Sequence, residues 1–565
     1  MTAPAFPEQP SAITPTSRAD VDAAVARVAA QSDAWLKTDV AERLKLLSAC
    51  LSGVAEAAPG WVRDVCAVKG LSPDDTLAGE EWMSGPVTTA RNIRLLIRAL
   101  EAGGQRKPAS ITTRPSGQLV ARVVPSDTTE KIMLAGITAD VWIEPGKPAS
   151  QGKIYREPKG HGAVALVLGA GNVSSIPAMD ALYKLFAEDE VVVLKMNPVN
   201  EVAGPHLAQA FKTLIDAGFL AIVYGGAEVG AHLAEHPQID TLHVTGSDRT
   251  YDAIVWGRDP EEQARRKAEN HPRNARPFTA ELGCVTPALI VPGDWNEADL
   301  EFQARHVASM VAQNASFNCN AAKVLVTARG WNLRERFLER VHASLARASA
   351  RKAYYPGAEA RYSAFLAKYP NAKVVGTPGE GVVPWTIIPE VPPVAGEYAL
   401  SNEAFCGVLA EVSLDANGPE EFLRAAVDFA NDKCWGTLSC MLLIDDGTQK
   451  RYAEAVDRAI EELRYGGIAI NLWAGVIYGL CSPTWGAFPG HPPTDIRSGS
   501  GVVHNAFLFD HPQKSVVRAP FRLRPTPPWF HDNKNLRNLG EALMREETDP
   551  GWLNLLTVAL ASFKG

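Results

Sequence analysis

The stretch GAVALVLGAGNVSSIPAMDALYKLFAEDEVVVLKMNP, residues 162–198, decides the fold class. A short apolar run ends in small residues, AMDALYKLFAEDE then has the spacing of a helix, and VVVLKMNP is again apolar. A strand, a helix and a strand within about 35 residues are typical of a parallel βαβ unit. The helical pattern GPHLAQAFKTLIDAG and the apolar runs LAIVYGG and TLHVTGS continue the alternation. The sequence therefore predicts an α/β fold built on a parallel sheet.

The bulk composition is that of a globular protein with more than one domain. Of the 565 residues, 46% are hydrophobic and 21% are charged, and a chain of this length exceeds what one hydrophobic core usually supports. The formal net charge of −8 argues against a nucleic-acid partner. No apolar stretch approaches the ~20 residues of a membrane-spanning helix. The first residues, MTAPAFPEQPSAITPTSRAD, lack the basic and apolar regions of a signal peptide, so we expect neither a membrane nor a secretory protein.

Cysteine usage points to a reducing compartment. Eight cysteines are few for this length, and none form a CxxC pair. Metal-site spacing is therefore absent, and a disulfide framework would be expected in a much shorter secreted chain. We expect reduced thiols, no metal and a cytoplasmic protein.

Three turns at predicted strand ends could contact a phosphate or a ribose. GAGNVSSIP contains Gly171 and lets backbone amides approach a ligand, although a simple tight turn fits equally well. Lys195 closes the next strand, with Asn197 just beyond it, at the edge where parallel sheets bind ligands; a solvated lysine is the plain alternative. HVTGSDRTYDAI repeats the theme with Gly246 and Ser247.

A carboxylate and a thiol are the candidates for chemistry. Glu281 opens ELGCVTPALIV and could act as a base if partly buried, or could be a solvated surface residue. Cys319 lies in ASFNCNAAKVLV and could be a nucleophile, a metal ligand, half of a disulfide or an inert core residue. These residues alone leave the choice open.

Taken together, these segments resemble the aldehyde dehydrogenase superfamily. TAELGCVTPALIV is similar to the family motif E-L-G-G-K-x-P-x-x-V, with Cys284 in place of the second glycine, and SFNCNAAKVLVT is similar to G-Q-x-C-x-A-x-x-R without its first glycine and glutamine. NEAFCGVLAEV resembles E-E-I-F-G-P-V, and AINLWAGVIYGLCSPTWGAF resembles the region that closes the substrate tunnel. The resemblance covers roughly residues 20 to 520 and rests on seven motifs in the family's order.

The resemblance assigns a role to each candidate residue. Cys319 would be the nucleophile, Glu281 the base that activates water, and Asn172 the oxyanion donor. The cofactor would contact the residues that stand at the cofactor-binding positions of these motifs: Lys195, Gly246, Ser247, Glu403, Phe405, Gly171 and Asn197. Phe317, Trp473, Tyr478 and Trp485 could line an apolar substrate pocket, although each could equally be a core residue.

The implied reaction is oxidation of an aldehyde, hydrophobic or aromatic, to the carboxylic acid through a thiohemiacetal and a thioester on Cys319. The cofactor would be NADP or NAD, with NADP favoured because Pro198 stands where members that prefer NAD often carry a glutamate. Two alternatives remain: an enzyme that passes the acyl group to coenzyme A, and a cofactor-binding scaffold without activity. Retention of Glu281 favours hydrolysis.

The expected architecture is a Rossmann-like cofactor domain, an α/β catalytic domain and a small β arm for oligomerisation. We assign residues 1–18 to a flexible arm, 19–135 and 160–278 to the cofactor domain, and 279–500 to the catalytic domain. Residues 136–159 and 501–521 would form the β arm, through which the family implies a homodimer or homotetramer. The role of a C-terminal tail over 522–565 is not evident from its composition.

Overall fold

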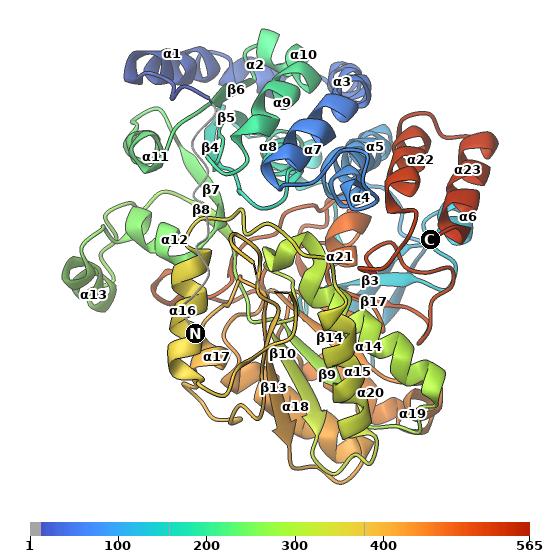
Figure 1. Ribbon diagram of the computed structural model, residues 1–565. Coiled ribbons are helices and arrows are strands. Elements are labelled where there is room, and N and C mark those ends of the chain that lie inside the picture. Colours follow the sequence, from blue (N-terminus) through green and yellow to red (C-terminus); the bar gives the residue numbers. More distant parts are fainter. Residues whose placement is uncertain (1–12, 158, 378) are drawn as a thin grey trace.

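The computed structural model describes residues 13–157, 159–377 and 379–565, and these form two α/β lobes (Figure 1). Each lobe has its own sheet, one of six strands and one of eleven. The fold is therefore the α/β class that the sequence predicts.

The six-stranded sheet has the order β16-β8-β7-β4-β5-β6, and all its strands except β16 run parallel. Its strands are β4 (Val164–Leu168), β5 (Val191–Lys195), β6 (Leu220–Val223), β7 (Thr241–Gly246), β8 (Phe278–Leu282) and β16 (Gly499–Ser500). The predicted βαβ unit is confirmed as β4, α8 (Ile176–Phe186) and β5. β5 and β6 follow β4 on one side of it, and β7 and β8 are then added on its other side. The switch point therefore lies between β4 and β7.

Helices surround this sheet and make the upper lobe of Figure 1. Side-chain caps fix where several of them begin, since Ser17 accepts a hydrogen bond from the N–H of Asp20 and Asp39 from that of Glu42. The helices are α1 (Arg18–Ala29), α2 (Ser32–Lys37), α3 (Val40–Val68), α4 (Ala78–Trp82), α5 (Thr88–Glu101), α9 (Gly204–Ala210), α10 (Lys212–Asp216), α11 (Ala227–Glu235), α12 (Asp248–Val255) and α13 (Pro260–Ala268).

The eleven-stranded sheet has the order β1-β2-β3-β17-β15-β14-β9-β10-β13-β12-β11. Its middle, from β17 to β12, is parallel, and the strands beyond at either end are antiparallel. The parallel strands are β9 (Pro287–Ile290), β10 (Val324–Ala328), β12 (Thr386–Ile388), β13 (Val408–Leu414), β14 (Ser439–Leu443), β15 (Gly467–Ile470) and β17 (Pro512–Arg518). The antiparallel ones are β1 (Ser110–Thr113), β2 (Leu119–Val124), β3 (Thr138–Ile143) and β11 (Lys373–Val374).

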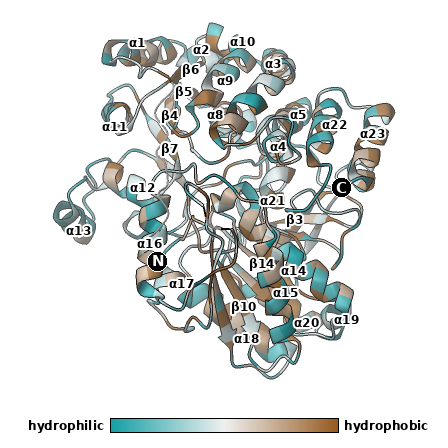
Figure 2. Ribbon diagram, in the orientation of Figure 1, coloured by the Kyte–Doolittle hydropathy of each residue, from teal (hydrophilic) through white to brown (hydrophobic). Residues whose placement is uncertain are grey.

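The second lobe also contains helices, of which α14 begins at a capping box between Asn296 and Asp299. They are α14 (Glu297–Ala312), α15 (Arg334–Ala346), α16 (Ala358–Lys368), α17 (Tyr398–Ser401), α18 (Pro419–Lys433), α19 (Asp446–Arg451), α20 (Ala453–Glu462) and α21 (Gly475–Leu480). Figure 2 shows the division expected from burial, with β10 and β14 hydrophobic and outer helices such as α13 hydrophilic.

The domain boundaries predicted from the sequence stay predictions, but the strands can be placed against them. Segments 136–159 and 501–521 supply β3 and β17, which pair antiparallel. β1 and β2, from segment 19–135, extend the same sheet. Most of the arm predicted over residues 1–18 lies outside the described residues. Within the described part, Thr16 exchanges hydrogen bonds with the backbone of Tyr224.

The C-terminal segment after residue 522 forms α22 (Leu536–Thr548) and α23 (Trp552–Phe563), beside α5 and α6 (Thr128–Met133) in Figure 1. The other short helix near the β arm is α7 (Lys153–Arg156). α22 lies so close to α4 that a Cβ on Gly79 would be 2.3 Å from the backbone of Leu536. Glu547 forms a buried ion pair with Arg91 of α5 at 3.1 Å. Among the described residues, no helix has the length and apolar character needed to cross a bilayer.

Candidate active site

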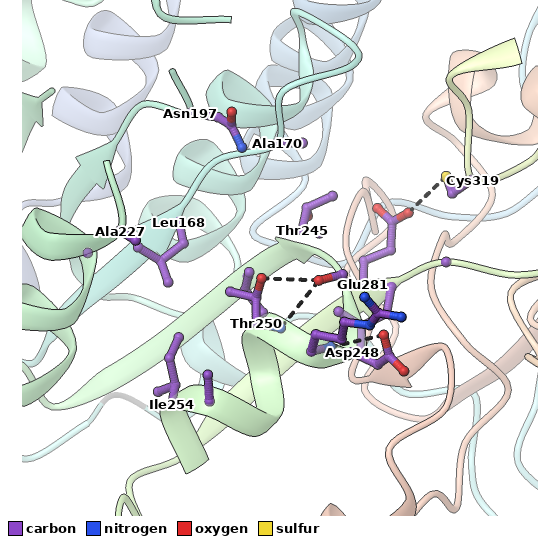
Figure 3. A pocket seen from close by; sticks show the side chains of 18 of the residues that line it. Leu168, Ala170, Asn197, Ala227, Thr245, Asp248, Thr250, Ile254, Glu281 and Cys319 are labelled. Carbon is purple, nitrogen blue, oxygen red and sulfur yellow. Dashed lines mark hydrogen bonds between the residues drawn. The ribbon is translucent and has the colours of Figure 1, made fainter. Parts of the chain in front are cut away.

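A cavity of about 1690 Å³ opens between the two lobes, at the carboxyl ends of the six-stranded sheet. The last residues of four strands line it: Leu168, Lys195, Gly246 and Leu282. These ends flank the switch point between β4 and β7, where doubly wound sheets bind their ligands. Figure 3 shows residues from this sheet edge on one side of the cavity and Cys319 on the other.

The predicted nucleophile and base face each other in this cavity. The thiol of Cys319 donates a hydrogen bond to Oε1 of Glu281, with Sγ and Oε1 3.4 Å apart (Figure 3). Glu281 lies on β8 and is 2% exposed, whereas Cys319 is half-buried. Of the eight cysteines, all within the described residues, Cys319 is the only one that is not fully buried. The pair, 38 residues apart in the chain, is therefore accessible to a small molecule in the cavity.

The loop before Cys319 has an unusual backbone. Asn314, Ala315 and Ser316 have φ angles of 52°, 56° and 68°, in the left-handed region that non-glycine residues rarely adopt. Three hydrogen bonds oppose this strain: Asn314 Nδ2 donates to the carbonyl oxygens of Phe317 and Asn172, and its Oδ1 accepts from the ammonium of Lys69. The loop is thus fixed to the helical layer beneath it, which holds Cys319 at the cavity wall.

Burial and neighbouring charges set the protonation of the pair. Burial, followed by the charge of Asp180, raises the pKa of Glu281 to about 7. Burial, followed by the charges of Glu281 and Glu403, raises the pKa of the Cys319 thiol well above its usual range, and Lys323 opposes this. The thiol is therefore neutral in this arrangement, and Glu281 can accept a proton near neutral pH.

Asn172 lies beside the thiol loop, as an oxyanion donor should. Its Nδ2 donates to the carbonyl oxygen of Phe317 at 2.9 Å, which leaves its second N–H hydrogen for another acceptor. Its own carbonyl oxygen accepts from Lys69, Tyr354 and Asn314 at 3.0 to 3.1 Å. This network orients Asn172, which also lines the cavity.

Most residues assigned to the cofactor line the same cavity: Lys195, Asn197, Gly246, Ser247, Glu403 and Phe405. Gly171 lies behind this surface, since a Cβ there would be 2.8 Å from Oδ1 of Asn197. Lys195 is 8% exposed, and no hydrogen bond or ion pair to its ammonium is found within the described residues. Burial lowers its pKa to about 8. An unpaired buried ammonium at a ligand-binding sheet edge fits an anionic or hydroxyl-rich ligand.

The four aromatic residues expected at the substrate pocket are not among the side chains that line this cavity: Phe317, Trp473, Tyr478 and Trp485. All four are at most 9% exposed. Phe317 packs behind the wall against Tyr355 and Phe405, with ring centroids 5.7 Å from each. The aromatic side chains at the cavity are Tyr355, Phe365, Tyr398, Phe405 and Trp435. A role for these four residues at a substrate pocket stays a prediction, because large aromatics near a catalytic loop also fill the core.

Sequence reasoning also missed several charged residues. Arg249, Arg258, Arg273 and Arg276 line the cavity, and the first two stand in the segment SDRTYDAIVWGRDP that follows Gly246. Lys323 lies under the thiol loop, although its sequence context suggested only the start of a strand. Cys284, which replaces a glycine of the family motif, is buried, and its Sγ accepts a hydrogen bond from the N–H of Thr286 at 3.3 Å. Within the described residues, no group of three or more His, Cys, Asp or Glu is arranged to hold a metal.

Comparison with known proteins gives one family. Residues 127–358 match the model of the aldehyde dehydrogenase family. A curated NADP-dependent glyceraldehyde-3-phosphate dehydrogenase from Scenedesmus vacuolatus is 27% identical over 170 residues, which span 30% of this chain and 64% of the relative.

Solved structures share the fold. The aldehyde dehydrogenase KauB from Pseudomonas aeruginosa superposes with a TM-score of 0.62 at 18% identity, over 89% of this chain and 90% of that one. A Mycobacterium tuberculosis aldehyde dehydrogenase complexed with NAD+ superposes with a TM-score of 0.60 at 20% identity, over 91% and 92% of the two chains.

Proposed function

We propose that the chain is an aldehyde dehydrogenase, which oxidises an aldehyde to the carboxylic acid with NADP or NAD, and the match of residues 127–358 to that family's model supports this. One observation carries the proposal: Cys319 Sγ lies 3.4 Å from Glu281 Oε1 inside a cavity at the ligand-binding edge of a doubly wound sheet. A nucleophile within hydrogen-bond reach of a base is the arrangement that covalent catalysis requires.

In the first step, the Cys319 thiol loses its proton to Glu281, and Sγ forms a bond to the aldehyde carbon. The carbonyl oxygen becomes an oxyanion, which the second N–H of Asn172 and the backbone N–H of Cys319 would stabilise. Removal of one such donor typically raises the barrier by ~3–4 kcal/mol. The network that holds the Asn172 carbonyl keeps this donor oriented before the substrate arrives.

A nicotinamide dinucleotide bound beside Cys319 would accept the hydride from the reacting carbon. This leaves an acyl group on Sγ as a thioester. Glu281 would release to solvent the proton that it took from the thiol. It would then take a proton from a water molecule, whose oxygen attacks the acyl carbon, and the Cys319 thiolate leaves as the carboxylic acid is released. The pKa of Glu281 near 7 suits a base that must both accept and return protons at neutral pH.

The residues present fit such a cofactor. The unpaired ammonium of Lys195 and the strand ends at Leu168 and Gly246 offer it a cation and backbone groups. We propose NADP as the preferred form, because Lys195, Arg249, Arg258 and Arg273 line the cavity and Pro198 provides no carboxylate to repel a 2′-phosphate.

For the substrate we propose a hydrophobic or aromatic aldehyde, supported by Tyr355, Phe405 and Trp435 on the cavity wall. We also propose a homodimer or homotetramer that uses the β arm. A cytoplasmic location is supported by eight unpaired cysteines.

The proposal is tested by following absorbance at 340 nm with NADP or NAD and a panel of aliphatic and aromatic aldehydes, without coenzyme A. The Cys319→Ala protein is assayed in parallel. We expect reduced cofactor from the wild type and none from the variant. Turnover that appears only when coenzyme A is added would instead identify acyl transfer to coenzyme A. If no cofactor is reduced under either condition, the alternative of a cofactor-binding scaffold without activity would stand.

A further inference from the structure

One lysine is built into the thiol loop itself. Lys323, 3% exposed, donates from Nζ to the carbonyl oxygens of Asn318 at 2.9 Å, Cys319 at 3.0 Å and Ala321 at 3.2 Å. The same ammonium forms an ion pair with Oε1 of Glu403 at 3.1 Å. Its positive charge is therefore fixed against the backbone of the nucleophile and cannot move away as a surface lysine would.

The charges that face Cys319 come from three elements. Glu281 of β8 accepts the hydrogen bond of the thiol, and the charge of Glu403, which follows α17, also acts on it. Both carboxylates oppose ionisation of the thiol. Lys323, just before β10, is the cation that favours it. The balance between one cation and two carboxylates thus bears directly on whether Cys319 is a thiol or a thiolate.

Other titratable groups face Lys323 and Glu403 rather than Cys319. Arg361 and Tyr355 lie near Glu403, and the buried thiol of Cys406 is within the field of Lys323. A Cβ on Gly283 would be 1.9 Å from Oε2 of Glu403, so this carboxylate sits in a fitted space. Its position against Lys323 is therefore enforced by packing.

We propose that Lys323 is a positioning residue whose charge fixes how readily Cys319 ionises, and that Glu403 holds this charge in check. The inference deepens the proposed function, since it concerns the same nucleophile. It assigns opposite effects to the two partners of one ion pair. Loss of Lys323 removes the cation and makes Cys319 less reactive, whereas loss of Glu403 removes a carboxylate, frees the ammonium and makes Cys319 more reactive.

A second lysine in the chain shows what a purely structural role looks like. Lys514 of β17 also donates to three carbonyl oxygens, those of Ile460, Glu461 and Leu463, at 2.7 to 3.1 Å. It is 2% exposed, and none of its three acceptors belongs to the loop that carries Cys319. Lys514→Met is therefore a matched control for the loss of a buried ammonium that ties a loop.

The test is the rate at which iodoacetamide alkylates Cys319 as a function of pH, followed by mass spectrometry of the peptide, without aldehyde or cofactor. The half-buried Cys319 is distinguished from the seven buried cysteines by its peptide. For Lys323→Met we expect alkylation about tenfold slower at neutral pH and a midpoint shifted to higher pH. Lys323→Arg should restore most of the rate. Lys514→Met should lower the melting temperature but leave the alkylation profile unchanged.

Glu403→Gln tests the same ion pair without changing Lys323. It should alkylate Cys319 faster, and the midpoint of its alkylation profile should shift to lower pH. Unchanged alkylation in Lys323→Met, a shift of equal size in Lys514→Met, or slower alkylation in Glu403→Gln would each overturn the inference. Because no dehydrogenase turnover is measured, the result is separate from the proposed function. An enzyme inactive toward every aldehyde could still show the opposite shifts, and an active one could lack them.

Discussion

Glu281 makes a prediction that can be measured without any substrate. Replacement of Glu281 by Gln keeps the shape of the side chain but removes a carboxylate that is 2% exposed and whose second oxygen, Oε2, has no hydrogen-bond partner within the described residues. In the folded protein the pKa of this carboxyl is about 7, against 4.5 in its ordinary environment. The wild type must therefore ionise a buried group as the pH rises, and the variant need not.

The size of the effect follows from linkage. The folded-state pKa lies about 2.5 above the ordinary value, and at about 1.4 kcal/mol per unit this corresponds to roughly 3.5 kcal/mol in all. Because the folded pKa is the higher one, the stability contribution is fully present below pH 4.5 and is lost as the pH rises toward 7. Above that it stays lost. Roughly 2.5 kcal/mol of this loss falls between about pH 5 and pH 9. Over that range, the unfolding free energy of Glu281→Gln should therefore rise by roughly 2.5 kcal/mol relative to that of the wild type.

The assay is urea unfolding of both proteins across that pH range, followed by tryptophan fluorescence. Glu56→Gln, at an exposed position on α3, serves as the control and should track the wild type at every pH. If the difference between Glu281→Gln and the wild type does not change with pH, Glu281 is not a buried carboxyl with a raised pKa, and its assignment as a base near neutral pH fails.

Three further predictions follow from the same contacts. Asn172→Ala should lower kcat by about 10²- to 10³-fold in steady-state assays while Cys319 remains open to alkylation, and an unchanged kcat would remove Asn172 from the oxyanion site. Lys195→Ala should raise KM for NADP more than KM for NAD, and equal increases would show that its ammonium does not contact the 2′-phosphate. Glu547→Ala should destabilise the protein by about 3 kcal/mol in urea unfolding, because buried Arg91 loses a partner, and a loss below about 1 kcal/mol would contradict this.

The sequence was sufficient for the parts of the fold that depend on local pattern. The βαβ unit from β4 to β5 is visible as two apolar runs around a helical spacing, and the structure confirms it. The approach of Cys319 to Glu281 was expected only through the family resemblance, since nothing in a spacing of 38 residues brings two side chains to 3.4 Å.

Features that depend on long-range register could not be predicted in the same way. Lys323 precedes an apolar strand, where a lysine usually reaches solvent, and only the folded loop turns its ammonium onto three carbonyls. Lys69 contacts Asn172 and Asn314 from 103 and 245 residues away. The aromatics chosen for the substrate pocket stay a prediction, because hydrophobicity alone does not separate a cavity wall from the core.

The pairing of β3 with β17 has a consequence for biosynthesis. β3 ends at Ile143 and β17 begins at Pro512, so the ribosome adds about 370 residues between them, which takes roughly 20 to 70 seconds. Throughout this interval one edge of β3, a strand buried along nearly its whole length in the finished protein, has no partner. An unpaired apolar edge of this kind is a template for aggregation. The nascent chain therefore has a use for chaperones that cover exposed strands until synthesis reaches β17, about nine-tenths of the way along the chain.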